Sequence, residues 1–329
     1  MLKMLIHGLK AVVFAKHLDI MKKISFLISA HNEEKIIGRT LENLINLPYE
    51  NYEIILGLDG CTDNTERIVK SFALKSEKIK YYKTNLRQGK PAVIDEIIKK
   101  AEGEIIIIND ADWIFEAENS KALQSLVSLF DKPKIGGVVP GIVLEENPLN
   151  VKEANLGYKM VYYSSFFWLQ FQKECFTKKE GNLRYIQDPR MFFTNIFLKK
   201  LYKQNTSLAD DYERTIDILD AGYKLVLSED INFPRMIAPY SPVPLKDLFF
   251  QKIRTSFARE QVNKKSSVQL TVANYYLPFI LFSLKKSWKT SIKTGLIISF
   301  WIMITALASI ISKTRKMDTK SGWKLRIRR

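Results

Sequence analysis

Residues 104–112 have the sequence EIIIINDAD, and this stretch decides the fold class. Its unbroken run of isoleucines predicts a short strand buried on both faces, since a half-exposed strand would alternate apolar and polar residues. Such strands are typical of parallel sheets that helices cover on both faces. The stretch therefore predicts an α/β domain with a mostly parallel central sheet flanked by helices.

Short apolar runs and helical patterns alternate on both sides of this stretch. Upstream, the runs predict strands at Ile24–Ser29, Tyr52–Leu58 and Lys78–Lys83. The segments between them predict helices at about 33–47, 65–74 and 89–100. Downstream, the pattern predicts a helix at Val151–Phe176, a strand at Arg190–Phe197, a helix at Asp210–Ala221 and a strand at Lys224–Leu227.

Polar clusters directly follow the strands predicted in the first 112 residues. In sheets of this kind, ligands bind beyond the carboxyl ends of the strands. We therefore expect the clusters to line one edge of the sheet. They are residues 29–33 (SAHNE), 59–60 (DG), 85–90 (NLRQGK) and 110–112 (DAD).

Asp110 and Asp112 form a D-x-D pair on the turn that follows the isoleucine run. An isolated D-x-D is most often a solvated turn. Placement at the carboxyl end of a buried strand instead favours a shared cation, because both carboxylates can face it. Hard oxygen ligands suit Mg²⁺ or Mn²⁺ with substrate phosphate and water completing the shell.

A second acidic group, Asp210-Asp211-Tyr212-Glu213, opens a predicted helix about a hundred residues later. Acids in a first turn stabilise the helix and need no further explanation. One of them can still project into a cleft. A carboxylate held there could act as general base on an acceptor hydroxyl.

Several alternative enzyme classes lack their motifs in this sequence. The absence of G-x-G-x-x-G after the first strand and of G-x-x-x-x-G-K-[ST] argues against dinucleotide-binding dehydrogenases and P-loop NTPases. G-x-S-x-G is also missing, which argues against α/β-hydrolases. The two cysteines and three histidines show no metal-binding or redox spacing.

The positive charge is concentrated in the last quarter of the chain. Residues 246–329 contain 18 Lys or Arg and three acidic residues. The first 245 residues contain 33 Lys or Arg and 32 acidic residues, so they are nearly neutral. A basic block fits either nucleic acid or a membrane surface. Two uncharged stretches of 19 residues, Ser266–Leu284 and Thr294–Ser312, lie within it and favour the membrane. We therefore expect a membrane-lipid partner and no nucleic acid.

Six segments occur in an order that resembles a known enzyme family. They are ISFLISAHNEE, LDGCTDNT, NLRQGKPAVID, IIIINDAD, LADDYERTIDILDAGYKLVL and QKIRT. Together they resemble inverting family 2 glycosyltransferases with a GT-A fold, over about residues 22–260. The order of DDY, APYSP, QKIRT and apolar helices is similar to the membrane-bound branch of that family.

The resemblance implies roles for residues at the predicted sheet edge. Ser29 and His31 would lie against the nucleotide base and ribose, and Glu33 would contact the nucleotide. Asp59 matches the acid that binds the base, usually uracil. Lys90 would approach the diphosphate.

The same resemblance implies roles for the two acidic groups. Asp110 and Asp112 would be the D-x-D pair that holds Mg²⁺ or Mn²⁺ beside the donor, with Asp112 the more direct ligand. Asp211 matches the general base, with Asp210 beside it.

Gln251 and Arg254 correspond to the Q-x-x-R-W segment of processive polysaccharide synthases and are expected near the donor. Thr255 stands in place of the tryptophan, which argues against a processive polymerase. A phospholipid contact is an equal alternative for Arg254.

The resemblance implies transfer from a nucleotide-diphosphate sugar to a glycan or lipid acceptor by a single displacement. A polyprenyl phosphate acceptor stays open, as does a membrane-anchored binding protein without catalysis. We expect an N-terminal extension (1–21), a cytoplasmic catalytic domain (22–245) and interfacial and transmembrane helices with a basic tail (246–329). Translation starting at Met21 is an alternative to Met1.

Overall fold

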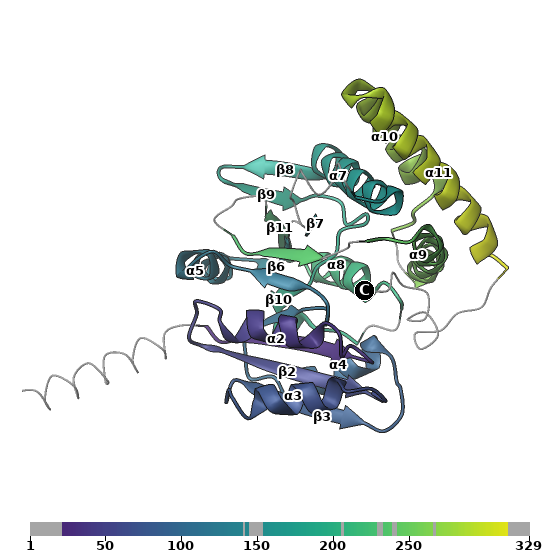
Figure 1. Ribbon diagram of the computed structural model, residues 1–329. Helices are drawn as coiled ribbons and strands as arrows, with labels where there is room; N and C mark the ends of the chain where they lie inside the picture. Colours follow the sequence, from purple (N-terminus) through teal and green to yellow (C-terminus); the bar gives the residue numbers. More distant parts are fainter. Residues whose placement is uncertain are drawn as a thin grey trace, which may run out of the picture.

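The computed structural model describes residues 22–140, 142–144, 154–204, 207–228, 233–238, 242–265 and 268–314. Strands between residues 24 and 238 form one nine-stranded sheet and one three-stranded sheet, with helices around them (Figure 1). The expected extension 1–21, the APYSP residues 239–241 and the basic tail after Thr314 lie outside the described residues.

The first half of the chain follows the predicted alternation of strands and helices. Strands β3, β2, β1 and β4 are neighbours in that order and run parallel. The elements are β1 (Ile24–Ala30), α2 (Ile37–Ile45), β2 (Tyr52–Asp59), α3 (Thr65–Ala73), β3 (Ile79–Thr84), α4 (Lys90–Ile98) and β4 (Ile105–Ile108). All four carboxyl ends therefore meet at one edge, as the polar clusters require.

The isoleucines of β4 divide between two hydrophobic cores. Ile106 and Ile108 contact the core on one face of the sheet, and Ile105 and Ile107 contact the core on the other face. Each of the four is at most 1% exposed. The inference that the run is buried on both faces is thus confirmed.

Two local contacts shape the first helices. At Gly57 on β2, a Cβ atom would lie 2.1 Å from Cγ1 of Val93, so the missing side chain lets α4 pack closely on the sheet. Helix α2 begins at Ile37 rather than near residue 33, because residues 31–36 form turns. The backbone N–H of Glu33 donates to Oγ1 of Thr65 (2.7 Å), which ties this turn to α3.

The second half of the chain makes the sheet mixed. Strand β10 lies antiparallel between β4 and β6, β11 runs parallel to β6, and the β8–β9 hairpin closes the far edge. The small sheet has the order β5-β12-β7. The elements are β5 (Ile114–Glu116), α5 (Ser120–Leu129), β6 (Ile135–Pro140), β7 (Ile142–Leu144), α7 (Leu156–Phe176), β8 (Thr177–Glu180), β9 (Leu183–Ile186), β10 (Ile196–Leu198), α8 (Asp210–Asp220), β11 (Lys224–Ser228) and β12 (Arg235–Ala238).

The predicted strand at Arg190–Phe197 is mostly wrong. Only Ile196 and Phe197 of this segment belong to β10, and the residues before them form turns and irregular backbone. Met191 has a φ of 61°, which a strand does not allow. The backbone N–H of Thr194 bonds to the carbonyl of Asp211 (3.2 Å) instead of to a neighbouring strand.

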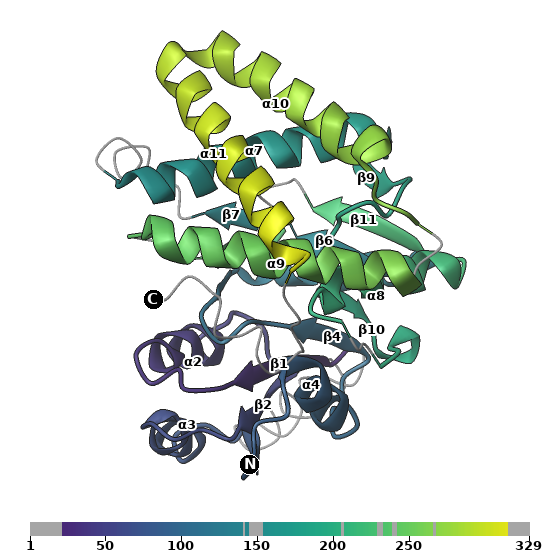
Figure 2. The same ribbon diagram turned by 90° about the vertical axis from the view of Figure 1, so that its right-hand side faces the viewer.

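The C-terminal part forms a helical layer over one side of the domain. It contains α9 (Leu245–Lys265), a π-helical turn (Val272–Tyr276), α10 (Leu277–Thr290) and α11 (Ile292–Ser312). Figure 2 faces this layer and shows α11 crossing in front of α9. The segment between the two uncharged stretches is almost entirely helical, and Ser291 alone separates α10 from α11.

One helix in the described part of the chain, α11, is long and apolar enough to cross a membrane by length and composition. The first uncharged stretch does not form such a helix. Thr271 and Asn274 form a capping box there, and Pro278 lies in the first turn of α10.

Candidate active site

The turn after β4 is fixed by buried side chains. Nδ2 of Asn109 donates to the carbonyls of Asp110 (2.9 Å) and Trp113 (3.0 Å). Oγ1 of Thr40 donates to the carbonyl of Ala111 (2.8 Å). These bonds hold the backbone of the D-x-D turn at the edge of the sheet, so its carboxylates emerge from a rigid base.

Lys90 joins the two acidic groups, which lie about a hundred residues apart in sequence. Its Nζ atom lies 2.8 Å from Oδ1 of Asp110 and 3.7 Å from Oδ1 of Asp210. Burial opposes the charge on Lys90, but Asp110, Asp210 and Asp211 outweigh it and raise the pKa of the ammonium. The structure therefore brings Asp110, Asp210 and Asp211 around one buried cation.

Asp210 is held from its other side by Arg214, one turn further along α8. Nη2 of Arg214 lies 2.9 Å from Oδ2 of Asp210, and its Nη1 donates to the carbonyl of Thr194 (2.6 Å). The Arg214 side chain is only 1% exposed. This buried pair fixes the side chain of Asp210 at the start of α8.

The ionisation of Asp211 is strongly perturbed by its surroundings. Burial, followed by the negative charge of Asp210, raises its pKa to about 6, although Lys90 and Arg214 oppose the shift. A carboxylate with such a pKa is a better proton acceptor than an ordinary aspartate and is still ionised at neutral pH. The raised pKa of Asp211 is compatible with the general-base role that the family resemblance implies, and the catalytic roles of Asp211 and Asp210 stay predictions.

Asp59 and the loop after β3 build the neighbouring part of the edge. The Asp59 carboxylate is 2% exposed and accepts from the backbone N–H groups of Gln88 (2.5 Å) and Gly89 (2.8 Å). His31 contacts the carbonyl of Asp59 through Nδ1 (2.6 Å). Asp59 thus positions the loop that leads into Lys90, a role that its sequence context did not predict.

Gly60 allows this close approach. Its φ is 60°, and a Cβ atom there would lie 2.7 Å from the backbone nitrogen of Arg87. Any larger residue would therefore push the loop away from Asp59.

Ser29 and Glu33 lie at the same edge, and both are buried, at 5% and 6% exposure. Ser29 is on β1 and Glu33 is on the turn that follows it. All the predicted residues from the first four strands therefore gather at one edge of the sheet.

Gln251 and Arg254 lie on α9 and are both partly buried. They belong to a different layer from the acids, and their predicted contact with the donor stays a prediction. Another residue of α9, Gln261, does touch the site: its Oε1 accepts from the N–H of Leu208 (3.0 Å), two residues before Asp210. Arg254 lies on the same face of α9 as Gln261, about 10 Å along the helix.

Two positioning residues, Arg214 and Gln261, were not foreseen. A signal for Arg214 existed, because it stands four residues after Asp210 on a predicted helix. Gln261 had no such signal, since its partner lies 53 residues away.

The candidate cation ligands are a pair rather than a full shell. The Asp110 carboxylate is 34% exposed, and Asp112 is also partly exposed. Among the described residues, no group of three His, Cys, Asp or Glu side chains could hold a metal ion. Two accessible carboxylates on one turn nevertheless fit Mg²⁺ or Mn²⁺ when substrate phosphate and water supply the other ligands.

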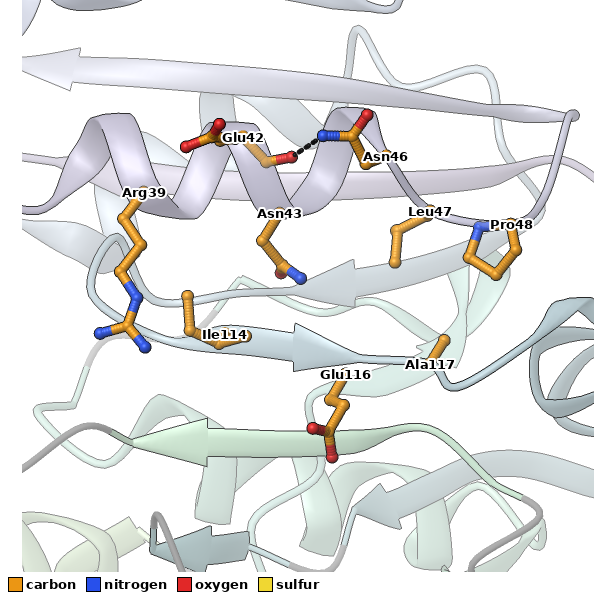
Figure 3. Close-up of a pocket in the computed structure, with 9 residues that line it drawn as sticks. All are labelled: Arg39, Glu42, Asn43, Asn46, Leu47, Pro48, Ile114, Glu116 and Ala117. Atoms are coloured by element: carbon orange, nitrogen blue, oxygen red, sulfur yellow. Dashed lines mark hydrogen bonds between the residues drawn. The ribbon is translucent and has the colours of Figure 1, made fainter.

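A separate cavity of about 390 Å³ lies between α2 and β5, and none of the predicted site residues lines it (Figure 3). Asn43 in its wall accepts from the N–H of Phe115 (2.9 Å), which joins α2 to the small sheet. The lining is Arg39, Glu42, Asn43, Asn46, Leu47, Pro48, Ile114, Glu116 and Ala117.

The family model described as "Glycosyl transferase family 2" matches residues 25–202, more than half of the chain. The chain belongs to glycosyl transferase family 2. The matched region contains β1 to β4 with Lys90, Asp110 and Asp112, and it ends just before the loop that leads to Asp210 and Asp211.

Two relatives of this glycosyltransferase differ in how much of the chain they match. A beta-monoglucosyldiacylglycerol synthase from Nostoc sp. is 34% identical over 144 residues, which make up 40% of this chain and 30% of that protein. The matched segment is thus less than a third of that relative. A dolichyl N-acetyl-alpha-D-glucosaminyl phosphate 3-beta-D-2,3-diacetamido-2,3-dideoxy-beta-D-glucuronosyltransferase from Methanococcus voltae is 29% identical over 90% of both chains.

The solved structures confirm the predicted GT-A fold. The mannosyltransferase PcManGT from Pyrobaculum calidifontis, in complex with GDP-Man and Mn²⁺, superposes with a TM-score of 0.54. The likeness covers 93% of this chain and 79% of that one at 16% identity.

Proposed function

We propose that this family 2 glycosyltransferase moves a sugar from a nucleotide-diphosphate donor to a hydroxyl group of a lipid-linked or glycan acceptor, with inversion, at a membrane surface. The observation that carries the proposal is the meeting of Asp110, Asp210 and Asp211 around Lys90. This arrangement offers a proton acceptor and a cationic group on the two sides of one reaction centre.

Asp211 is the proposed general base. It accepts the proton of the acceptor hydroxyl as that oxygen attacks the anomeric carbon and the bond to the diphosphate breaks. Its raised pKa of about 6 matches this task near neutral pH. Asp210, fixed by Arg214, increases the basicity of Asp211 through its negative charge.

Lys90 is proposed to contact the departing diphosphate, whose negative charge grows as the bond breaks. Asp110 and Asp112 would hold Mg²⁺ or Mn²⁺, as their hard oxygen atoms permit. When bound, that cation would neutralise charge on the diphosphate. The Mn²⁺ in the related mannosyltransferase supports this assignment.

The nucleotide is proposed to lie over the ends of β1 and β2. His31 and Ser29 face the base and ribose, and Glu33 makes a further contact with the nucleotide. Asp59 binds the base while it holds the loop of Gln88 and Gly89 in place. Gln251 and Arg254 are proposed to approach the donor from α9.

A hydroxyl acceptor on a lipid-linked sugar is favoured over a bare polyprenyl phosphate. A phosphate nucleophile is already ionised at neutral pH and gains little from a general base, whereas a hydroxyl needs one. The name of the Methanococcus relative describes transfer to a sugar on dolichyl phosphate, and the name of the Nostoc relative describes synthesis of a glucosyl diacylglycerol. Both acceptors are lipids.

We place the catalytic domain on the cytoplasmic side of the membrane, because nucleotide sugars are cytoplasmic. The basic excess of residues 246–329 and the apolar α11 support attachment to an anionic membrane.

The proposal is tested with membranes that contain the protein and a panel of radiolabelled nucleotide sugars, with Mg²⁺, Mn²⁺ or a chelator. We expect one donor to label a lipid-extractable product in the presence of metal. Label in a polymer would contradict the lipid acceptor. No transfer and no donor hydrolysis with any nucleotide sugar would favour the binding-protein alternative.

A further inference from the structure

Six exposed apolar side chains form one line along α11. Their spacing of three or four residues places them on a single face of the helix. Each of them is at least 36% exposed, and four of them exceed 55%. The α11 stripe, as we call it, consists of Ile292, Leu296, Phe300, Met303, Leu307 and Ile310.

The opposite face of α11 packs against the domain. Ile298 and Ala308 are completely buried, and Trp301 is 8% exposed. The Trp301 ring lies edge-on to Phe279 of α10, and Nζ of Lys252 on α9 lies 4.9 Å from its centre. Helix α11 is thus apolar on both sides. Within the described residues, one side packs against the domain, whereas the α11 stripe is exposed.

Helices α10 and α11 form a tight hairpin. A Cβ atom at Gly295 would lie 2.4 Å from the Trp288 ring, so the glycine lets α10 and α11 touch. The Ser291 side chain caps the start of α11. Helix α10 adds Leu277 and Leu281 to the exposed apolar surface, at 47% and 58%.

The packing of α11 argues against a membrane crossing. Trp301 is the tenth of 21 residues in α11, so Lys252 would lie near the bilayer centre if α11 crossed it. A cation there is strongly unfavourable. Helix α9 is also tied through Gln261 to the loop before Asp210. A crossing would therefore bring the reaction centre towards the hydrocarbon.

The turn of the hairpin cannot lie deep in the bilayer either. Exposed lysines surround it and continue to the far end of α11. They are Lys285, Lys289, Lys293 and Lys313. Ammonium groups at both ends of an apolar helix match lipid phosphates when the helix lies at the level of the headgroups.

We propose that α10 and α11 form an in-plane anchor that lies flat on an anionic bilayer, with the α11 stripe among the acyl chains and the lysines at the lipid phosphates. This inference rests on the proposed function and specifies how the protein attaches to the membrane. Because α9 contacts both α11 and the loop of Asp210, the anchor holds the reaction centre at a fixed height above the lipid.

Depth measurements along α11 test the orientation. The full chain with Cys61 and Cys175 replaced by serine receives one cysteine in place of Leu296, Met303 or Ile310, each labelled with an environment-sensitive fluorophore. The probe membrane is a phosphatidylcholine–phosphatidylglycerol vesicle with lipids brominated at shallow or deep acyl positions. Leu74→Cys is the matched control, because Leu74 is 90% exposed outside this layer.

A flat helix gives the same depth at all three positions and no quenching at Leu74→Cys. A crossing helix places Met303 deepest and the other two about 10 Å shallower, and that profile would overturn the proposal. Absence of quenching at all three positions would also overturn it, while donor hydrolysis by the same samples shows whether the proposed function survives.

A second variant tests the stripe itself. Leu296→Glu with Met303→Glu should lower partition into phosphatidylglycerol vesicles at least about tenfold, because two apolar side chains no longer enter the acyl region. Leu74→Glu should leave partition unchanged. Unchanged binding of the double variant, with helical content retained by circular dichroism, would contradict the anchor.

Discussion

At the scale of single residues, the surroundings of Asp211 lower the stability of the folded protein but favour its proposed role as a base. Its side chain is partly buried, and desolvation together with the negative charge of Asp210 raises its pKa from 3.8 to about 6. The folded protein therefore disfavours the ionised form that a general base requires. Above pH 6 the ionised Asp211 lowers the free energy of unfolding, and below the unfolded pKa near 4 it does not.

This conflict predicts that Asp211→Asn stabilises the fold at pH 8. The difference between 3.8 and about 6 corresponds to on the order of 3 kcal/mol, an upper limit for the gain in unfolding free energy. The gain should vanish near pH 4, where aspartate at this position is protonated. Chemical denaturation in EDTA at both pH values measures it, and equal effects at pH 4 and pH 8 would contradict the assigned pKa.

Lys90 and Asp59 make tertiary contacts that their sequence motifs do not predict. The family resemblance implied a diphosphate contact for Lys90, but its ion pairs with Asp110 and Asp210 depend on the fold. Asp59 was predicted only as a base-binding residue, yet its carboxylate also holds the backbone of Gln88 and Gly89. Neither interaction has a local sequence signal.

At the scale of elements, the strands of the first half were predictable because burial on both faces leaves a continuous apolar run. The β1–β4 edge and its polar clusters follow from that pattern. The segment 190–195 was misassigned because its aromatic residues resemble a strand, whereas the backbone N–H of Thr194 bonds to α8. The β8–β9 hairpin escaped prediction because each of its strands has only four residues and β8 consists entirely of polar ones.

Helix α8 depends on the buried Arg214–Asp210 pair. Arg214→Met should lower the free energy of unfolding by about 3–5 kcal/mol, because it leaves Asp210 buried without its closer cationic partner. Adding Asp210→Asn should recover part of this loss. Denaturation curves measure both, with Arg67→Met, an exposed position on α3, as control.

Equal losses in the single and double variants would show that the guanidinium acts through its bonds to Thr194 and Asn195 rather than through Asp210.

At the scale of the whole molecule, the excess of basic residues and the exposed apolar stripe of α11 lie in the same C-terminal part of the chain. The first 245 residues are nearly neutral, and the basic excess lies with α9 to α11 and the tail. The sequence predicts a membrane partner, which stays a prediction, and it does not distinguish a crossing helix from a flat one. That distinction depends on which face of α11 packs against α9, and packing is set by the tertiary structure.

We propose that Asp211 accepts a proton in a centre whose donor side is built by Lys90 and Asp110. The most direct test of this proposal compares donor affinity, from calorimetry, with transfer rate in Asp211→Asn, using Asp220→Asn at the exposed end of α8 as control. We predict donor affinity within about threefold of the unmodified protein and transfer reduced by about 10²–10⁴-fold. Transfer by Asp211→Asn at the rate of the control would contradict the account.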